Sequence, residues 1–511
     1  MNLLKIYKEE ILIWSGLIIV FGLTRLVSLT ILPVFVDEAI YVRWSQVLWN
    51  DPANRFIPLT DGKQPLFMWL AAPLTQIFTD PLFASRLISV IAGFFGMAGM
   101  FLIGRELADK RFGFFASLLY VLTPFIIFYD RLAVPDGLLS SFGVWALYLS
   151  ILLVRRLRLD VALILGAIIG FATLTKTPGF FYLALLPTSL LLFKFKEKNS
   201  KYKFAKLICL WALVFVISFG MYNLLRLSPL FYLISQRQPD FVFSFGEVLQ
   251  HPFDPFIGRL IEIFFWLGQY LTWPIFIMSI TGFFLFAKSR VRLALYILAW
   301  SLLPLLAEAQ IAKGFTPRYF IFTVPPLILT AGYFLVRIFD ANLRSFKLVI
   351  FALLIPAVIF DLFLILDPQK AAIPPKERSG YLEEWSSGYG IAEIADYLKT
   401  LPVNQPVLVG TEGSFGTLPD GLMIYLTENQ NITVVGMGQP AAIHKLPQTL
   451  IDNAKDKPVF LVVNKSRINN PDDSRLELVA SYPKAMNQEG LRDSLLFFKV
   501  KSIEENNTSK P

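Results

Sequence analysis

The feature that most constrains this chain is a series of long apolar runs between residues 11 and 366. A helix needs about 20 mostly apolar residues to cross a bilayer, and eleven runs approach that length. They cover residues 11–32, 83–104, 113–129, 135–154, 161–176, 178–193, 206–225, 259–286, 291–308, 319–337 and 347–366. The pattern predicts a polytopic α-helical membrane protein.

The composition excludes several classes of protein. With 55% hydrophobic and 17% charged residues, the chain is too apolar for a soluble globular protein. The net charge of +9 does not indicate a nucleic-acid partner, because the basic residues lie in short connections between apolar runs and form no basic patch. Cys209 is the single cysteine, so no internal disulfide can form, and two histidines are too few for a His-rich metal centre.

The distribution of lysine and arginine predicts the orientation. If the N-terminus is cytoplasmic, the short inner connections hold twenty of these residues, as the positive-inside rule requires. The run 11–32 has no small-residue cleavage site after it, so we expect it to remain as the first transmembrane helix. An odd number of spans then places the C-terminal region outside.

Two long loops and a C-terminal region lie on the predicted outer side. In the first loop, residues 39–49 and 65–78 are expected to form helices along the membrane interface. After Asp367 the composition becomes that of a soluble α/β domain. Its helix is predicted at 391–401 and its strands at 407–410, 433–436, 459–463, 476–480 and 495–500. We therefore expect a transmembrane domain, 1–366, and an extracytoplasmic domain, 367–511.

Charged residues gather at the predicted outer ends of the spans. Asp37 and Glu38 follow the first span, where carboxylates are costly unless they have a task, although they could also be loop residues or helix caps. Further charged or polar residues on the same side are Lys63, Arg131, Asp136, Lys176, Lys313, Arg318 and Tyr319.

Five short stretches occur together in a fixed order: Asp-Glu-Ala-x-Tyr, Gly-Lys-x-Pro-Leu, Arg-x-x-x-Pro-Asp, Leu-Thr-Lys and Arg-Tyr-x-x-x-x-x-Pro-Pro. The set resembles glycosyltransferase family 39, which includes the protein O-mannosyltransferases, and more closely the bacterial 4-amino-4-deoxy-L-arabinose lipid A transferases. The match covers about residues 10–340. It implies the GT-C fold and an inverting transfer of sugar from a polyprenyl-phosphate donor to a lipid, glycan or protein acceptor. It also implies the outer face of a prokaryotic cytoplasmic membrane.

The resemblance assigns roles to individual residues. Asp37 is the expected catalytic base, Glu38 its neighbour, Asp136 the second acidic residue of the site and Lys63 a ligand of the donor phosphate. Other expected phosphate contacts are Arg43, Arg131, Arg318 and Tyr319, and further candidates are Tyr41, Arg86, Lys176 and Lys313. The chemistry agrees, because a general base must reach the acceptor proton and cations must hold the departing phosphate.

The chain also departs from the family pattern. Ile40 stands where members often carry Arg, and Arg43, one helical turn along, could replace that contact. Some relatives bind a metal through a Glu just before the lysine, but Gly62 stands there. His251 alone would be a poor metal ligand. These residues do not support a divalent metal, so we assign no cofactor.

Alternatives remain for the function and for four of the cations, because Lys313 and Arg318, like Lys176, are either helix-end anchors or site residues. A transporter or flippase of a lipid-linked sugar would place its charges near mid-membrane, on broken or repeated helices. An oligosaccharyltransferase-like enzyme with a pyrophosphate donor would carry a Trp-Trp-Asp motif in its outer domain, and this chain has none there. Arg86 could snorkel or pair with a carboxylate, and Lys176 is either a helix-end anchor or a site residue.

Overall fold

The computed structural model describes residues 3–341, 344–438 and 443–501. The chain divides into two compact units. The first comprises Met1–Leu29, Ala53–Leu70 and Arg86–Pro374, and the second comprises Thr30–Pro52, Ala71–Ser85 and Pro375–Pro511. The division into functional domains at residue 366 stays a prediction.

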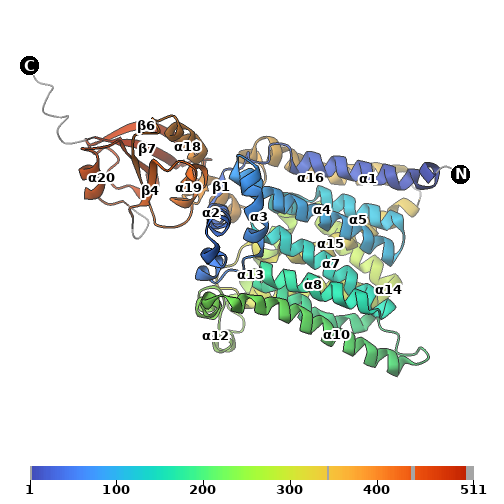
Figure 1. Ribbon diagram of the computed structural model, residues 1–511. Helices are drawn as coiled ribbons and strands as arrows, with labels where there is room; N and C mark the ends of the chain where they lie inside the picture. The colour runs from blue at the N-terminus through green and yellow to red at the C-terminus, as the bar shows by residue number, and fades with distance from the viewer. Residues whose placement is uncertain (1–2, 342–343, 439–442, 502–511) are drawn as a thin grey trace, which may run out of the picture. The chain divides into compact units, whose positions relative to one another are not determined.

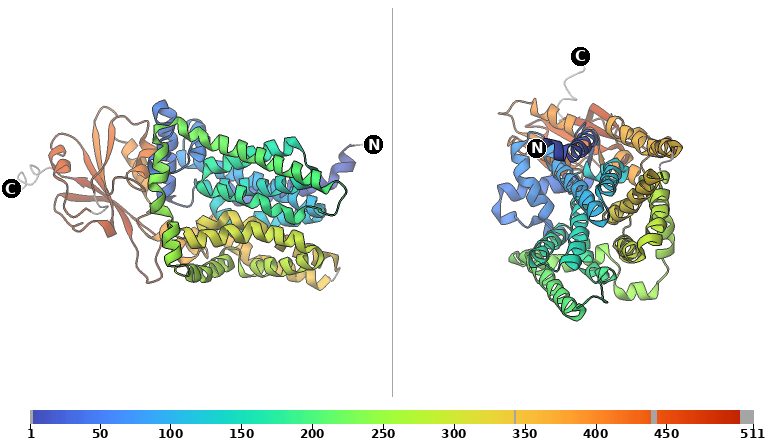
Figure 2. Two further views of the ribbon diagram at one scale, coloured as in Figure 1. Left: turned by 90° about the horizontal axis from the view of Figure 1, so that it is seen from below. Right: turned by 90° about the vertical axis from the view of Figure 1, so that its right-hand side faces the viewer.

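Long helices run side by side in the first unit (Figures 1 and 2). They are α1 (Leu3–Arg25), α4 (Pro81–Leu107), α5 (Lys110–Leu122), α6 (Pro124–Asp130), α7 (Pro135–Arg156), α8 (Leu159–Thr175), α10 (Ser200–Tyr222), α13 (Phe256–Tyr270), α14 (Trp273–Ile311), α15 (Val324–Asp340) and α16 (Arg344–Leu366). By length and composition, five helices of the described part can cross a membrane, or six if the bent pair α5–α6 is one span. The chain is thus a multi-pass membrane protein.

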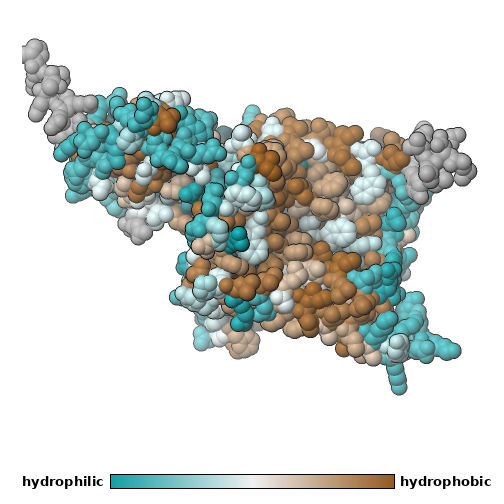
Figure 3. Space-filling model, in the orientation of Figure 1, coloured by the Kyte–Doolittle hydropathy of each residue, from teal (hydrophilic) through white to brown (hydrophobic). Residues whose placement is uncertain are grey.

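The helices of the bundle pack closely, and their outer surface is apolar. A Cβ added at Gly282 of α14 would come within 2.0 Å of the Thr330 carbonyl oxygen of α15, so only glycine permits this approach. The Thr330 hydroxyl also donates to the Ser279 carbonyl oxygen at 2.8 Å. Figure 3 shows a broad hydrophobic surface along the bundle and hydrophilic residues at the end opposite α12 (Phe245–Gln250).

Two predicted spans are interrupted. The expected single helix over 259–286 is wrong, because α13 ends at Tyr270 and α14 starts at Trp273, with Thr272 at a φ of 62° between them. Pro274 lies in the first turn of α14, where a missing N–H is tolerated, and it would disrupt the interior of a continuous helix. The span 113–129 bends by 63° between α5 and α6, where Pro124 follows Thr123.

Short elements complete the first unit. Between α8 and α10 the chain forms η3 (Thr177–Gly179), α9 (Phe180–Leu185) and η4 (Leu186–Leu192) instead of one regular helix over 178–193. The others are η2 (Ile57–Asp61), η5 (Asn223–Leu227), η6 (Pro229–Tyr232), α11 (Leu233–Phe241) and η7 (Pro317–Thr323). These pieces include the turns that hold several of the predicted site residues.

Contacts between distant connections define two ends of the bundle. At the basic end, Arg155 pairs with Glu106 at 2.9 Å, and Arg290 donates to the Leu107 carbonyl oxygen. We call the other end the site end. It contains the start of α7, the end of α8 and η7, which are joined by the ion pairs described below.

The second unit is built on a five-stranded sheet of order β4-β3-β5-β7-β6. Its strands are β3 (Val407–Thr411), β4 (Ile432–Gly436), β5 (Val459–Asn464), β6 (Leu476–Pro483) and β7 (Ser494–Val500). The strands β4, β3 and β5 are parallel, and β7 and β6 are antiparallel. With α18 (Ile391–Lys399), α19 (Asp420–Leu426) and α20 (Gln448–Asn453), this confirms the predicted small α/β region.

The segment that follows α1 belongs to this second unit. The strand β1 (Val34–Phe35) pairs with β2 (Ser387–Gly388) in antiparallel orientation, and α2 (Val36–Asn50) packs against α19. The Gln46 amide donates to the Ile424 carbonyl oxygen at 2.8 Å. The two predicted helices of the first loop are present as α2 and α3 (Leu66–Ile77), and their position along a membrane interface stays a prediction.

Candidate active site

The two adjacent carboxylates, Asp37 and Glu38, lie in the first turn of α2. The Glu38 side chain turns back, and its Oε2 atom accepts a hydrogen bond from the Phe35 backbone N–H at 3.0 Å. Glu38 is fully buried, whereas Asp37 is partly exposed. A carboxylate in this position also interacts favourably with the helix dipole. Glu38 therefore stabilises the start of α2, and Asp37 is the more accessible of the two.

Tyr41 and Arg43 follow on the same helix. Tyr41 is buried, with its ring centroid 6.0 Å from that of Trp44. The Arg43 guanidinium donates to the Thr427 hydroxyl at 3.3 Å. Burial lowers the pKa of Arg43, and the negative charge of Asp420 partly offsets this effect. The structure thus links Arg43 to α19, and its predicted role at a donor phosphate stays a prediction.

Three predicted residues meet at the site end of the bundle. Asp136 lies in the first turn of α7 and is 2% exposed. Its Oδ1 atom is 2.6 Å from the Lys176 Nζ atom, and its Oδ2 atom is 3.9 Å from the Arg318 Nε atom. These residues come from the start of α7, the end of α8 and η7, so helix packing alone brings them together.

An aromatic ring and a second carboxylate complete this cluster. The Lys176 Nζ atom lies 4.8 Å from the centroid of the Tyr319 ring, and the Arg318 guanidinium lies 5.7 Å from it. Glu308, on the last turns of α14, is buried within electrostatic reach of Lys176 and Asp136. We define the anion-pair cluster as Asp136, Lys176, Glu308, Arg318 and Tyr319. It combines two buried carboxylates with two cations at one end of the bundle.

Lys63 lies on a tight turn that is held to the end of α8. Its Nζ atom is 3.2 Å from the Asp61 Oδ2 atom, and the next side chain, Gln64, donates to the Thr177 hydroxyl at 2.9 Å. Gly62 has a φ of 66°, and a Cβ there would lie 2.9 Å from the Arg237 Cβ atom. A glutamate at position 62 would be strained in this turn, which gives a physical reason for the departure from the family pattern.

Arg131 and Arg86 are both fully buried and donate to backbone carbonyl groups at the end of α1. The acceptors are the carbonyl oxygens of Thr24, Arg25, Val27 and Ser28 for Arg131, and that of Leu29 for Arg86. The last carbonyl groups of a helix have no partner within the helix, so these arginines satisfy them. The structure therefore gives both residues a task in holding the fold, and nothing in these contacts supports the predicted phosphate role.

Lys313 lies apart from the anion-pair cluster and is exposed. Its Nζ atom is 3.7 Å from the Glu247 Oε1 atom and 5.6 Å from the centroid of the Phe243 ring. It therefore contacts the second long loop, which comprises residues 227–258. Within the described ranges, no three or more His, Cys, Asp or Glu side chains are placed to hold one metal ion.

The comparisons with known proteins concern the family and the fold. Residues 62–222 match the family model described as dolichyl-phosphate-mannose-protein mannosyltransferase. ArnT from Cupriavidus metallidurans in the apo state superimposes with a TM-score of 0.57 at 17% identity, over 96% of this chain and 98% of that chain. The same protein bound to undecaprenyl phosphate gives 0.56 at 15% identity, with the same coverage of each chain.

A third solved structure extends the likeness to another enzyme. The archaeal oligosaccharyltransferase AglB from Archaeoglobus fulgidus superimposes with a TM-score of 0.53 at 14% identity, over 99% of this chain and 76% of that chain. The chain has the GT-C fold. Together with the family model, this confirms the resemblance and the enzyme class, glycosyltransferase, that the sequence motifs predicted. No curated protein sequence matches the chain.

The sequence analysis of this GT-C chain missed two buried acids. Glu308 belongs to the anion-pair cluster, and Asp361 lies in α16 within electrostatic reach of Arg25. Among the described residues, neither carboxylate oxygen of Asp361 has a hydrogen-bond partner. A carboxylate within an otherwise apolar run was the available signal, because such residues are rare in membrane spans and face the protein interior.

Proposed function

We propose that this GT-C chain transfers a sugar from a polyprenyl-phosphate carrier to an acceptor hydroxyl group, with inversion at the anomeric carbon. The donor class is supported by two neighbouring structures, in which ArnT binds undecaprenyl phosphate and AglB binds dolichol phosphate. The acceptor is a lipid, a glycan or a protein.

The observation that carries this proposal is the anion-pair cluster. The Asp136 carboxylate is 2% exposed and lies 2.6 Å from Lys176 and 3.9 Å from Arg318. These residues come from the start of α7, the end of α8 and η7. Buried charges of this kind are expensive in a membrane protein and mark functional sites by default. In this proposal, Lys176, Arg318 and Lys63 hold the negative charge that develops on the departing phosphate. Asp136 and Glu308 keep the cations in position.

The reaction is a single displacement. The acceptor oxygen forms a bond to the anomeric carbon while the bond from that carbon to the phosphate oxygen breaks. The acceptor proton passes to the Asp37 carboxylate, which is partly exposed in the first turn of α2. The carrier leaves as a polyprenyl phosphate. As written, this step involves neither a nucleotide nor a metal ion.

The outer face of a cytoplasmic membrane is part of the same proposal. The basic end of the bundle carries Arg105, Lys110, Arg155, Arg156 and Arg158. Lys288 and Arg292 lie beside Arg290, where a φ of −148° and a ψ of 65° interrupt the helical geometry of α14. By the positive-inside rule, this end is cytoplasmic. The site end then faces outward, where a polyprenyl-phosphate sugar has its head group after translocation.

The test is transfer from a panel of radiolabelled polyprenyl-phosphate sugars in membranes that contain the wild type or Asp37→Asn. We expect label to reach an acceptor only with the wild type, while both proteins insert to the same level. The matched control is Asp396→Asn, which makes the same change at an exposed residue of α18 and should transfer at the wild-type rate. Full activity of Asp37→Asn would contradict the assignment of the base.

The transporter alternative is separated by the same membranes. A flippase would move the labelled donor between leaflets without cleaving it. Two results together would favour a transporter over a transferase. The Asp37→Asn variant would still translocate the donor, and the wild type would produce no cleaved carrier.

A further inference from the structure

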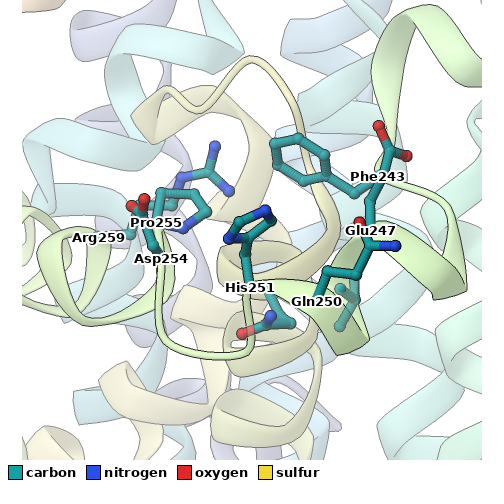
Figure 4. A pocket seen from close by; sticks show the side chains of 9 residues that line it. Phe243, Glu247, Gln250, His251, Asp254, Pro255 and Arg259 are labelled. Atoms are coloured by element: carbon teal, nitrogen blue, oxygen red, sulfur yellow. The ribbon is translucent and has the colours of Figure 1, made fainter.

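The second long loop of the first unit encloses a pocket that none of the predicted catalytic residues lines. The cavity has a volume of about 550 Å³, within the range of about 300–1,000 Å³ that is usual for small-molecule sites. Its lining comes from α12, the turn after α12, the start of α13 and the end of α14. Figure 4 shows the imidazole of His251 between the ring of Phe243 and Pro255.

Four polar side chains line this cavity: Gln250, His251 and Asp254, which are exposed, and Gln310, which is partly buried. The amides and the imidazole can both donate and accept, and the carboxylate accepts. The cavity therefore offers a mixed set of donors and acceptors beside the apolar face of Phe243. Hydroxyl groups match such a set, because each can donate and accept at once.

Two charged side chains of the pocket, Arg259 and Glu247, already have partners. The Arg259 guanidinium donates to the Ala309 and Lys313 carbonyl oxygens at 2.9 and 3.1 Å, and it lies 5.1 Å from the centroid of the Phe315 ring. Glu247 accepts from the Ser244 backbone N–H and lies near Lys313. Arg259 is therefore not offered to an anionic ligand. The pocket suits a neutral one.

The same segment has an apolar outer side. Phe245, Leu249, Phe253 and Ile257 recur every four residues and are exposed. The pocket residues Glu247, Gln250, His251 and Asp254 alternate with them along the chain. An exposed apolar row of this kind is typical of a segment that lies on a membrane surface. The pocket then opens at the level of lipid head groups, which both a glycolipid and a free glycan can reach.

The pocket is joined to the anion-pair cluster through α14. Gln310 lines the pocket, and Glu308, two residues earlier, belongs to the cluster. Two residues span about 3 Å along a helix and point about 200° apart. The bonds from Arg259 to the Ala309 and Lys313 carbonyl groups fix the pocket wall to this last turn. A ligand held in the pocket would thus be separated from the anion-pair cluster by the width of α14, which is about 10 Å.

We propose that this pocket binds a neutral sugar ring of the acceptor, so that the second long loop selects the acceptor. The proposal rests on the proposed glycosyl transfer, because only that reaction makes the ligand an acceptor. Phe243 covers the apolar face of the ring. Gln250, His251, Asp254 and Gln310 bind its hydroxyl groups.

The test measures sugar binding to the full chain in phosphatidylcholine nanodiscs without any donor. One arm uses radiolabelled neutral disaccharides, with maltose among them, and the other uses monoglucosyl diacylglycerol in the same nanodiscs. We expect binding in at least one arm, weakened at least tenfold by Asp254→Asn and by Gln310→Ala. The matched control, Glu262→Gln, changes an exposed carboxylate of α13 outside the pocket and should bind as the wild type does.

The two arms distinguish the sources of the sugar. Binding of the disaccharide identifies a glycan, and binding of the lipid alone identifies a glycolipid head group. Absence of binding in both arms, or equal binding by the wild type and both pocket variants, overturns the proposal. Pocket-dependent binding without any glycosyl transfer would support the pocket and reject the proposed function.

Discussion

The energetic weight of the pair between Asp136 and Lys176 can be measured by a double-mutant cycle. The Lys176→Met variant removes the cation that lies 2.6 Å from the carboxylate, and Asp136 keeps Arg318 at 3.9 Å as a second partner. A hydrogen bond to a charged group contributes about 1.5–3 kcal/mol, so we expect a loss in this range. Asp136→Asn leaves two cations without their carboxylate, and removal of one partner from a buried pair costs about 3–5 kcal/mol.

The double variant should lose less stability than the sum of the two single variants. The expected coupling is about 1.5–3 kcal/mol, because residues in direct contact do not contribute independently. The assay is reversible unfolding in mixed micelles for the wild type, both single variants and the double variant. Donor transfer by the Lys176→Met variant, measured in parallel, reports whether this cation also contacts the donor.

A second pair serves as the control for burial. Lys203 and Glu197 approach to 2.8 Å, but each side chain is 41% exposed. Exposed pairs are screened by water, so the same cycle there should give a much smaller coupling. If the coupling at Asp136 is no larger than at this surface pair, the argument that burial makes the cluster energetically important is refuted.

Three further predictions concern residues outside this pair. Glu38→Gln should weaken the start of α2 by about 0.5–1 kcal/mol, through loss of the charge near the helix dipole; faster hydrogen exchange in α2 of this variant than in α2 of the wild type would show this. Arg131→Lys should cost about 3 kcal/mol, because three ammonium donors cannot replace a guanidinium fork that reaches four carbonyl groups; the thermal inactivation temperature should fall while activity per folded molecule is kept. Burial lowers the pKa of Lys484 from 10.5 to about 8. The unfolded chain therefore binds this proton where the folded one does not, and the second unit should gain up to about 3 kcal/mol between pH 8 and 10.5. Hydrogen exchange in β5 and β7, corrected for intrinsic rates, should lose this pH dependence in Lys484→Met.

The sequence was sufficient for most of the elements. The apolar runs locate the long helices because a bilayer of fixed thickness demands helices of nearly fixed length. The five strands and the helix at 391 were predicted from local composition and confirmed within a few residues. The break at Thr272 was missed because hydrophobic content does not change there, and only Trp273-Pro274 marks the new helix start.

The sequence also identified which charges lie at the helix ends, and the motif order gave the GT-C class. It could not assign partners to those charges. Asp136, Lys176 and Arg318 are separated by 40 and 142 residues, and only the packing of α7, α8 and η7 brings them together. Arg131 is a cation near a helix end, as Lys176 and Arg318 are. Packing, however, directs its guanidinium to carbonyl groups at the end of α1 and in the turn that follows.

The sequence by itself therefore determined the membrane class, most of the long helices and the set of candidate residues, because these depend on local hydrophobicity and on motifs in a fixed order. The tertiary structure decided which carboxylates are paired, which arginines hold the fold, and that Asp37 lies in one unit with the C-terminal sheet. These properties depend on contacts between residues far apart in the chain. Such contacts are set by how the helices and strands pack.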